Sequence, residues 1–276
     1  MHALLSVAIA HLRQCLPDDI SYRAAESYHC QSAVRLYRKE LASSIGCHNM
    51  DPLISTYLLL GMFCFSTQRY SPGDSWVFSS DPTALNWLLI QCGLNYILAY
   101  TAPYLGQSMW HRLFSQSDDE HHTFDNHTPG REGLHPGLAE LCGIDETTTE
   151  NDNPYHWPLR MLSPMLKLDL AREYPLKLTS FAPRLLPEFT GLLLRKDPKA
   201  LVILSYWLAK MSELKLWWIR LRASLECTAI CMFLENSKDS RILKLLEFPA
   251  KSCGYLLRHV REDAVFVANF DLIGLF

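Results

Sequence analysis

The sequence lacks the short signatures by which many enzymes hold nucleotides, metals or an activated serine. It contains no G-x-G-x-x-G, no G-x-x-x-x-G-K-[ST], no H-E-x-x-H and no G-x-S-x-G pattern, which mark dinucleotide, phosphate, zinc and serine-nucleophile sites. Its 12 glycines are too few and too dispersed to cradle phosphates. We therefore predict no cofactor, so any catalysis would depend on side chains alone.

The nine cysteines also lack the spacing of a metal or redox motif, because no two of them are separated as C-x-x-C. An odd, dispersed count favours free thiols in a reducing compartment over a disulfide framework. Cys227 and Cys231 are four residues apart and would share one face of a helix. We interpret this pair as core packing, since a free cysteine in an apolar run behaves as a small hydrophobe, and predict no metal site.

A basic excess and a membrane-spanning run are absent as well. The net charge is -3, whereas a nucleic-acid-binding domain normally carries a basic field. The longest apolar run, residues 52–65, is shorter than the roughly 18 residues that suggest a spanning helix. Residues 1–15 have no basic leader and no small-residue cleavage site, so we interpret them as a helix of the fold. We expect an intracellular protein, of the cytoplasm or nucleus, without direct nucleic-acid binding.

Helical periodicity, by contrast, is abundant. Residues 23–43 place apolar side chains at three- and four-residue spacings, as an amphipathic surface helix does. Asp-Pro dipeptides begin at Asp51, Asp81 and Asp197, each before an apolar stretch. Aspartate caps a helix N-terminus, and proline fits its first position. The dipeptides predict helices at about 52–66, 82–100 and 198–215.

Strand signals are weak. The chain has no Asn-Gly or Asp-Gly turn between alternating apolar runs. Residues 263–276 are the best strand candidate, although they fit a final helix or an extended tail equally well. We therefore predict an all-α fold, with residues 1–276 forming a single multi-helix domain.

Between residues 115 and 156 the sequence becomes polar, acidic and rich in histidine. This composition predicts a long loop or partly disordered insertion within the domain, with one short helix at 134–143. Its histidines lie near several carboxylates, and both are zinc ligands; they are His121, His122, His127 and His135. We favour a solvated acidic loop, because nothing in the stretch predicts a rigid scaffold for a metal.

Aromatic residues and methionines are the residues that carry most information about a possible binding site. Helix faces of this kind usually fill a core, but all-α domains also hold apolar ligands between helices, in cavities with few polar groups. If a pocket exists, we predict that it is lined by Met62, Phe63, Trp87, Gln91, Tyr96, Trp207, Met211 and Trp218. His29 and His111 are the candidate general acid–base groups, although a structural role is the simpler interpretation of both.

Residues 192–230, "LLLRKDPKALVILSYWLAKMSELKLWWIRLRASLECTAI", resemble the regulatory domain of fungal zinc-cluster transcription factors of the sterol-uptake-control type. The similarity lies in the Asp197-Pro198 turn, the helix after it and the pair Trp217-Trp218. Three further segments resemble helices of the same family in their order and spacing: "MHALLSVAIAHLR", "AESYHCQSAVRLYRKEL" and "TALNWLLIQCGLNYIL". The resemblance spans most of the chain outside 115–156.

This resemblance implies an all-α domain with an apolar interhelical pocket, which holds a sterol in the sterol-responsive members. Those members also carry a six-cysteine binuclear zinc cluster and a basic linker that read DNA, and this sequence contains neither. Our first hypothesis is a domain that binds a sterol- or terpenoid-like molecule without binding DNA. The alternative is a cofactor-independent enzyme of fungal secondary metabolism that cyclises (in a pericyclic, Diels–Alder-like step) or isomerises an apolar intermediate. A third hypothesis is that the sequence is a piece of an ordinary regulator. The sequence also leaves open whether the protein forms a homodimer.

Overall fold

The computed structural model describes residues 1–16, 21–67, 71–114, 126–168 and 176–262, and within these ranges it contains helices and no strand. The predicted all-α fold is therefore confirmed. The strand candidate at 263–276 lies outside the described residues. None of the helices in the described ranges combines the length and apolar character needed to cross a membrane.

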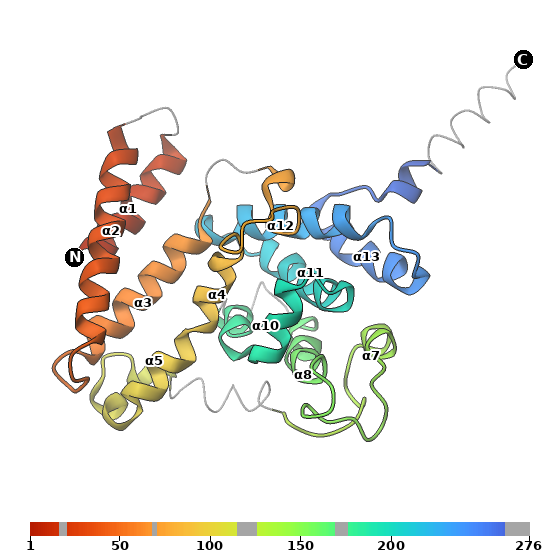
Figure 1. The fold of residues 1–276 in the computed structure, drawn as a ribbon, viewed down its shortest axis with the longest axis horizontal. Helices are drawn as coiled ribbons and strands as arrows, with labels where there is room; N and C mark the ends of the chain where they lie inside the picture. The colour runs from red at the N-terminus through yellow and green to blue at the C-terminus, as the bar shows by residue number, and fades with distance from the viewer. Residues whose placement is uncertain (17–20, 68–70, 115–125, 169–175, 263–276) are drawn as a thin grey trace, which may run out of the picture.

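The N-terminal part is a group of three helices that pack on one another at one end of the molecule (Figure 1). They are α1 (His2–Cys15), α2 (Ser21–Leu41) and α3 (Met50–Phe65). Ala3, Ala33 and Leu60 form a small buried cluster between them. Small side chains at such contacts let the helix backbones approach closely.

Short helices connect this group to the rest of the chain. The 3₁₀ turn η1 (Pro72–Asp74) precedes α4 (Asn86–Cys92), α5 (Leu94–Thr101) and the 3₁₀ turn η2 (Ala102–Gln107). α4 packs against both α3 and the later turn η3 (Ala182–Arg184), so it lies between the two parts of the molecule.

The main core surrounds α11 (Pro198–Ser212), which contacts α12 (Trp217–Leu234) and α13 (Ser240–Cys253) (Figure 1). Every residue of α11 from Ala200 to Met211 is buried. A helix that is apolar all round must be enclosed by protein on all sides. The other helices that pack against it are α7 (Pro136–Cys142), α8 (His156–Met165), α9 (Leu176–Thr179) and α10 (Pro187–Leu194).

The three Asp-Pro dipeptides behave differently from one another. Asp197 caps α11 as predicted, because its carboxylate accepts hydrogen bonds from the backbone N–H groups of Lys199 and Ala200. Asp51 lies inside α3, which begins one residue earlier, and accepts from Ser108 and from the Met109 N–H. The cap predicted at this position is therefore wrong: Asp51 instead ties α3 to the segment after η2.

The single helix predicted at 82–100 is also wrong. Asp81 closes a local turn with Thr83, and the helical residues that follow are divided into α4 and α5 at Gly93. The hydroxyl of Tyr57, from α3, donates a hydrogen bond to the Ile90 carbonyl. In an unbroken helix that carbonyl would accept from Leu94. Here it accepts from the Gly93 N–H, at 3.3 Å, and from a side chain of another helix.

Within the predicted insertion, the short helix is confirmed as α7, whose bounds fall inside 134–143. The ring of His135 accepts a hydrogen bond from the Leu138 N–H at its N-terminus, and Gly143 ends it in the left-handed conformation with φ of 69°. The Leu138, Leu141 and Cys142 side chains of α7 are buried in the main core. Residues 115–125 lie outside the described ranges.

We predict that Asp197→Ala destabilises the protein by about 1–2 kcal/mol, since α11 loses its N-cap. Asp197 also accepts a hydrogen bond from the Tyr155 hydroxyl, at 2.9 Å, so Tyr155→Phe measures that contribution separately. Chemical denaturation gives the free energies of unfolding. Asp81→Ala is the matched control, because no helix begins at Asp81, and it should cost clearly less. Equal losses in the two aspartate variants would contradict the capping role.

Candidate functional site

Four aromatic rings from four helices meet where the two parts of the molecule join. Phe65, at the end of α3, lies edge-on to three tryptophans, with ring centroids 5.2 Å from Trp87, 6.3 Å from Trp207 and 5.9 Å from Trp218. Such T-shaped pairs stabilise by about 0.5–1.5 kcal/mol beyond the area they bury. We call these four residues the aromatic cluster. Phe65, Trp87 and Trp207 are buried, whereas Trp218 is half-buried.

A buried ion pair lies next to the aromatic cluster. The Arg222 guanidinium, on α12, is 5.4 Å from the Trp87 ring and donates through Nε to the Phe65 carbonyl at 2.7 Å. Its Nη1 is 3.5 Å from a carboxylate oxygen of Glu226, one helical turn further along. Arg222 thus holds the C-terminal end of α3 on α12 and places a cation against an aromatic face.

Glu226 is fully buried, with 0% of its surface exposed. Besides Arg222 it accepts a hydrogen bond from the Ser75 hydroxyl, so two segments, α12 and the residue after η1, supply this polar group. A buried carboxylate is tolerated only when it is paired and hydrogen-bonded. We did not predict this group from the sequence, although an Arg and a Glu four residues apart on a largely apolar helix were a usable signal.

One polar atom of the aromatic cluster has no partner. The indole N–H of Trp207 donates to the Leu178 carbonyl at 2.8 Å, but the buried indole N–H of Trp87 finds no acceptor among the described residues. Leaving a buried donor unsatisfied costs about 1–3 kcal/mol. The Trp87 N–H is therefore able to bind an oxygen that enters this region.

The other residues predicted to line a pocket differ in burial and in their distance from the aromatic cluster. Met211 is buried in the same core as the aromatic cluster. Gln91 donates to the Gly61 carbonyl at 2.9 Å and to the Trp87 carbonyl at 3.3 Å, so its amide already has partners. Met62 and Phe63 are half-buried. Tyr96 is 63% exposed and is not part of the buried cluster.

The two histidines proposed as acid–base groups lie away from this region. His29 is 2.8 Å from His2 between their Nδ1 atoms, and its ring lies against Tyr28. His111 is exposed, after η2. Neither has a described contact with Glu226 or with the aromatic cluster. The ionisable side chains described near the cluster are Arg222, which contacts Trp87, and its partner Glu226.

Two surface pockets occur elsewhere. One, of about 320 Å³, lies between residues 150–154 and α10. The other, of about 610 Å³, is lined by residues of the segment 126–134 and by Arg160 and Lys167. Neither is lined by a residue of the aromatic cluster. In the described structure Phe65, Trp87 and Trp207 are buried in the main core, and Trp218 packs against it.

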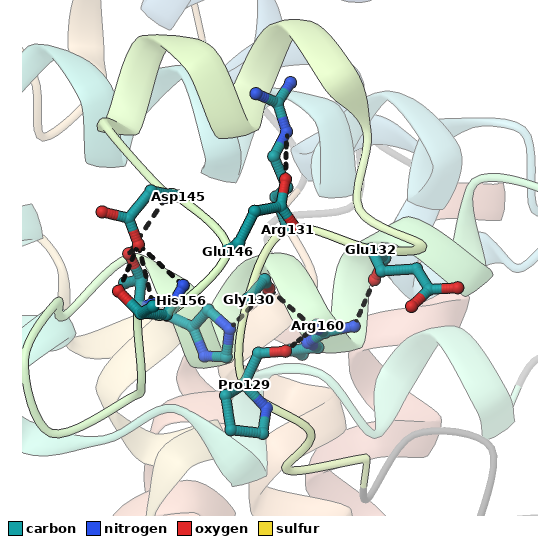
Figure 2. A network of polar contacts seen from close by, with 10 residues as sticks. Pro129, Gly130, Arg131, Glu132, Asp145, Glu146, His156 and Arg160 are labelled. Atoms are coloured by element: carbon teal, nitrogen blue, oxygen red, sulfur yellow. Dashed lines mark hydrogen bonds and ion pairs between the residues drawn. The ribbon is translucent and has the colours of Figure 1, made fainter.

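Figure 2 shows the polar contacts that hold the segment 129–132 onto α8. The buried Arg160 donates to the carbonyl oxygens of Glu132 at 2.5 Å, Pro129 at 3.0 Å and Gly130 at 2.7 Å. His156 Nε2 is 3.1 Å from the Gly130 carbonyl. Because these backbone groups are satisfied by side chains of α8, the segment is fixed without secondary structure of its own.

The histidines of this region also have structural contacts. His127 lies 2.8 Å from a Glu150 carboxylate oxygen and stacks on Trp157, with ring centroids 4.3 Å apart. His135 packs against Tyr206 and caps α7. His121 and His122 lie outside the described residues. Among the described histidines of the insertion, each is thus bound to a protein partner.

Burial lowers the pKa of His156, and Arg160 adds to the effect, while the Gly130 carbonyl opposes it. The Nδ1 atom is buried and has no partner among the described residues, so a proton there would bring an unpaired charge. The unfolded chain binds that proton more readily, near its ordinary pKa of 6.5. This contribution to stability is complete above that pH and is lost as the pH falls below it.

We predict that His156→Gln flattens the pH dependence of stability between pH 7 and pH 5, since glutamine keeps a donor for the Gly130 carbonyl but does not titrate. The free energy of unfolding is measured by denaturant titration at each pH. His48→Gln, at an exposed histidine, is the control and should follow the wild type. Parallel curves for His156→Gln and the wild type would show that His156 does not resist protonation.

Comparisons with protein-family models, with curated proteins and with solved structures found no match to this chain. The resemblance to zinc-cluster regulators stays a prediction from the motifs quoted above.

Proposed function

We propose that this protein binds an apolar small molecule, of the sterol or terpenoid class, at the aromatic cluster. The observation that carries the proposal is the buried indole N–H of Trp87, which lacks a partner among the described residues in a region of aromatic rings. A largely apolar surface with one directional polar group is the usual composition of a small-molecule site.

The ligand enters by displacing the half-buried ring of Trp218. Trp218 is the second residue of α12 and follows the short connection from α11, so its side chain is the least enclosed of the four. The apolar skeleton then packs against Phe65 and Trp207. A hydroxyl or carbonyl oxygen at one end accepts the hydrogen bond that Trp87 offers, which removes the cost of its unpaired donor.

Binding is tested with a naturally fluorescent sterol, delivered from cyclodextrin, by energy transfer from the tryptophans. We expect saturable binding to the wild type. Trp87→Phe keeps an aromatic side chain, although a smaller one, and removes the indole N–H. It should weaken binding about tenfold, since one buried hydrogen bond contributes about 1.4 kcal/mol.

Trp110→Phe is the matched control, because Trp110 donates to Ser55 at 3.0 Å and is not part of the aromatic cluster. Its affinity should equal that of the wild type. Equal affinities for Trp87→Phe and the wild type would remove the hydrogen bond from the proposal. The absence of saturable binding of either a sterol or a terpenoid alcohol would overturn the site.

A second candidate function is cofactor-independent catalysis at the same site. The observation that favours it is the buried carboxylate of Glu226, which is joined to the aromatic cluster through Arg222. Holding an apolar intermediate in one folded conformation can supply about 7–11 kcal/mol at best. A carboxylate beside it can move a proton during isomerisation, and neither contribution requires a cofactor.

Recovery of the bound molecule separates the two candidates. We predict that a binding protein returns the added terpenoid unchanged, whereas an enzyme returns an isomer of the same mass and different chromatographic retention. If the second candidate is correct, Glu226→Gln should slow the conversion at least a hundredfold, as expected for the loss of a general base, while binding changes little. Conversion at the wild-type rate by Glu226→Gln would exclude the proposed role of Glu226.

A further inference from the structure

Three thiols from two helices converge in the core behind α11. Cys227 and Cys231 are one helical turn apart on α12, and Cys253 is the last residue of α13. Their sulfur atoms all lie within 4.8 Å of one another. Cys227 and Cys231 are fully buried, and Cys253 is half-buried. We call these residues the thiol cluster.

The protein groups around the thiol cluster satisfy the sulfurs only weakly. Cys227 Sγ lies 3.6 Å from the Ser205 carbonyl oxygen and 3.5 Å from that of Pro249. Cys253 Sγ is 3.5 Å from the Ala250 carbonyl oxygen. These are long contacts of a weak S–H donor, and the three thiols otherwise hydrogen-bond to one another.

The spacing suits a metal ion bound by three sulfurs. A metal–sulfur bond of about 2.3 Å places the sulfurs of a flat three-coordinate site about 4 Å apart, which lies within the limit observed here. No further histidine, cysteine or carboxylate joins the group among the described residues. A structural zinc site needs four such ligands, and an iron–sulfur cluster needs four cysteines as a rule.

We propose that Cys227, Cys231 and Cys253 form a three-thiolate site for Cu(I). Soft thiolates select this soft monovalent ion, which three sulfur ligands satisfy. On binding, three S–H bonds break and three Cu–S bonds form, and the three protons pass to solvent. The half-buried Cys253, next to Gly254, is the point of entry.

The site was not expected from the sequence, which predicted core packing for Cys227 and Cys231. The missing ligand, Cys253, follows Cys231 by 22 residues and reaches the other two because α13 folds back onto α12. Once three thiols surround one point, their combined affinity for a soft ion exceeds what two sulfurs on one helix face provide.

The inference is tested on reduced, metal-free protein under anaerobic conditions. Cu(I) is titrated in the presence of a chromophoric Cu(I) chelator, and bound metal is counted per chain. We expect one tightly held Cu(I) per wild-type chain, with X-ray absorption showing three sulfur neighbours. Bound metal should also raise the Tm, because it ties α12 to α13 only in the folded state.

Cys253→Ser is the principal variant, since a half-buried position tolerates serine, and it should lower the Cu(I) affinity at least tenfold. Cys231→Ala is the second variant, and circular dichroism without metal verifies that both fold. Cys47→Ser, at an exposed thiol, is the control and should bind as the wild type does. Equal affinity in Cys253→Ser and the wild type, or tighter binding of Zn(II) than of Cu(I), would overturn the site. Sterol binding is measured separately and does not bear on this result.

Discussion

The need to enclose α11 on all sides explains how the other helices are arranged. Twelve successive residues, Ala200 to Met211, are buried, and water contact with such a surface costs about 25 cal/mol for each Å² of apolar area. The helix therefore requires neighbours around its whole circumference. α12 and α13, which follow α11 in the chain, pack against it. The earlier helices α7, α8, α9 and α10 pack against it as well. Arg160 and His156 of α8 hold the segment 129–132, which precedes α7, by hydrogen bonds to its carbonyl groups.

Both proposed sites lie along α12, and this follows from its position. α12 packs on α11, on α13 and on α3, so successive turns face different neighbours. Its first turns bring Trp218 and Arg222 to Phe65 of α3, and its later turns bring Cys227 and Cys231 to Cys253 of α13. A helix surrounded in this way buries polar and soft ligand atoms that a surface helix would leave in water.

Much of the helical pattern could be predicted from the sequence, because its signals are local. Asp197 and Pro198 start α11 through contacts with residues next to them in the sequence. The apolar periodicity of residues 23–43 likewise predicts α2. The predicted cap at Asp51 and the predicted single helix at 82–100 were wrong because residues distant in the sequence bind the groups involved. Ser108 engages the carboxylate of Asp51, and Tyr57 occupies the Ile90 carbonyl that a continuous helix would have used.

From the residues alone, we could predict an all-helical chain, the start of its buried central helix and the aromatic residues available to a site. Long-range packing brings Trp87, Trp207 and Trp218 to Phe65 and leaves Tyr96 facing solvent. It also decided that Glu226 is paired in the core and that Cys253 completes the thiol cluster. The physical reason is that helical periodicity and capping act over about four residues, whereas these contacts join segments as far apart as Ser75 and Glu226.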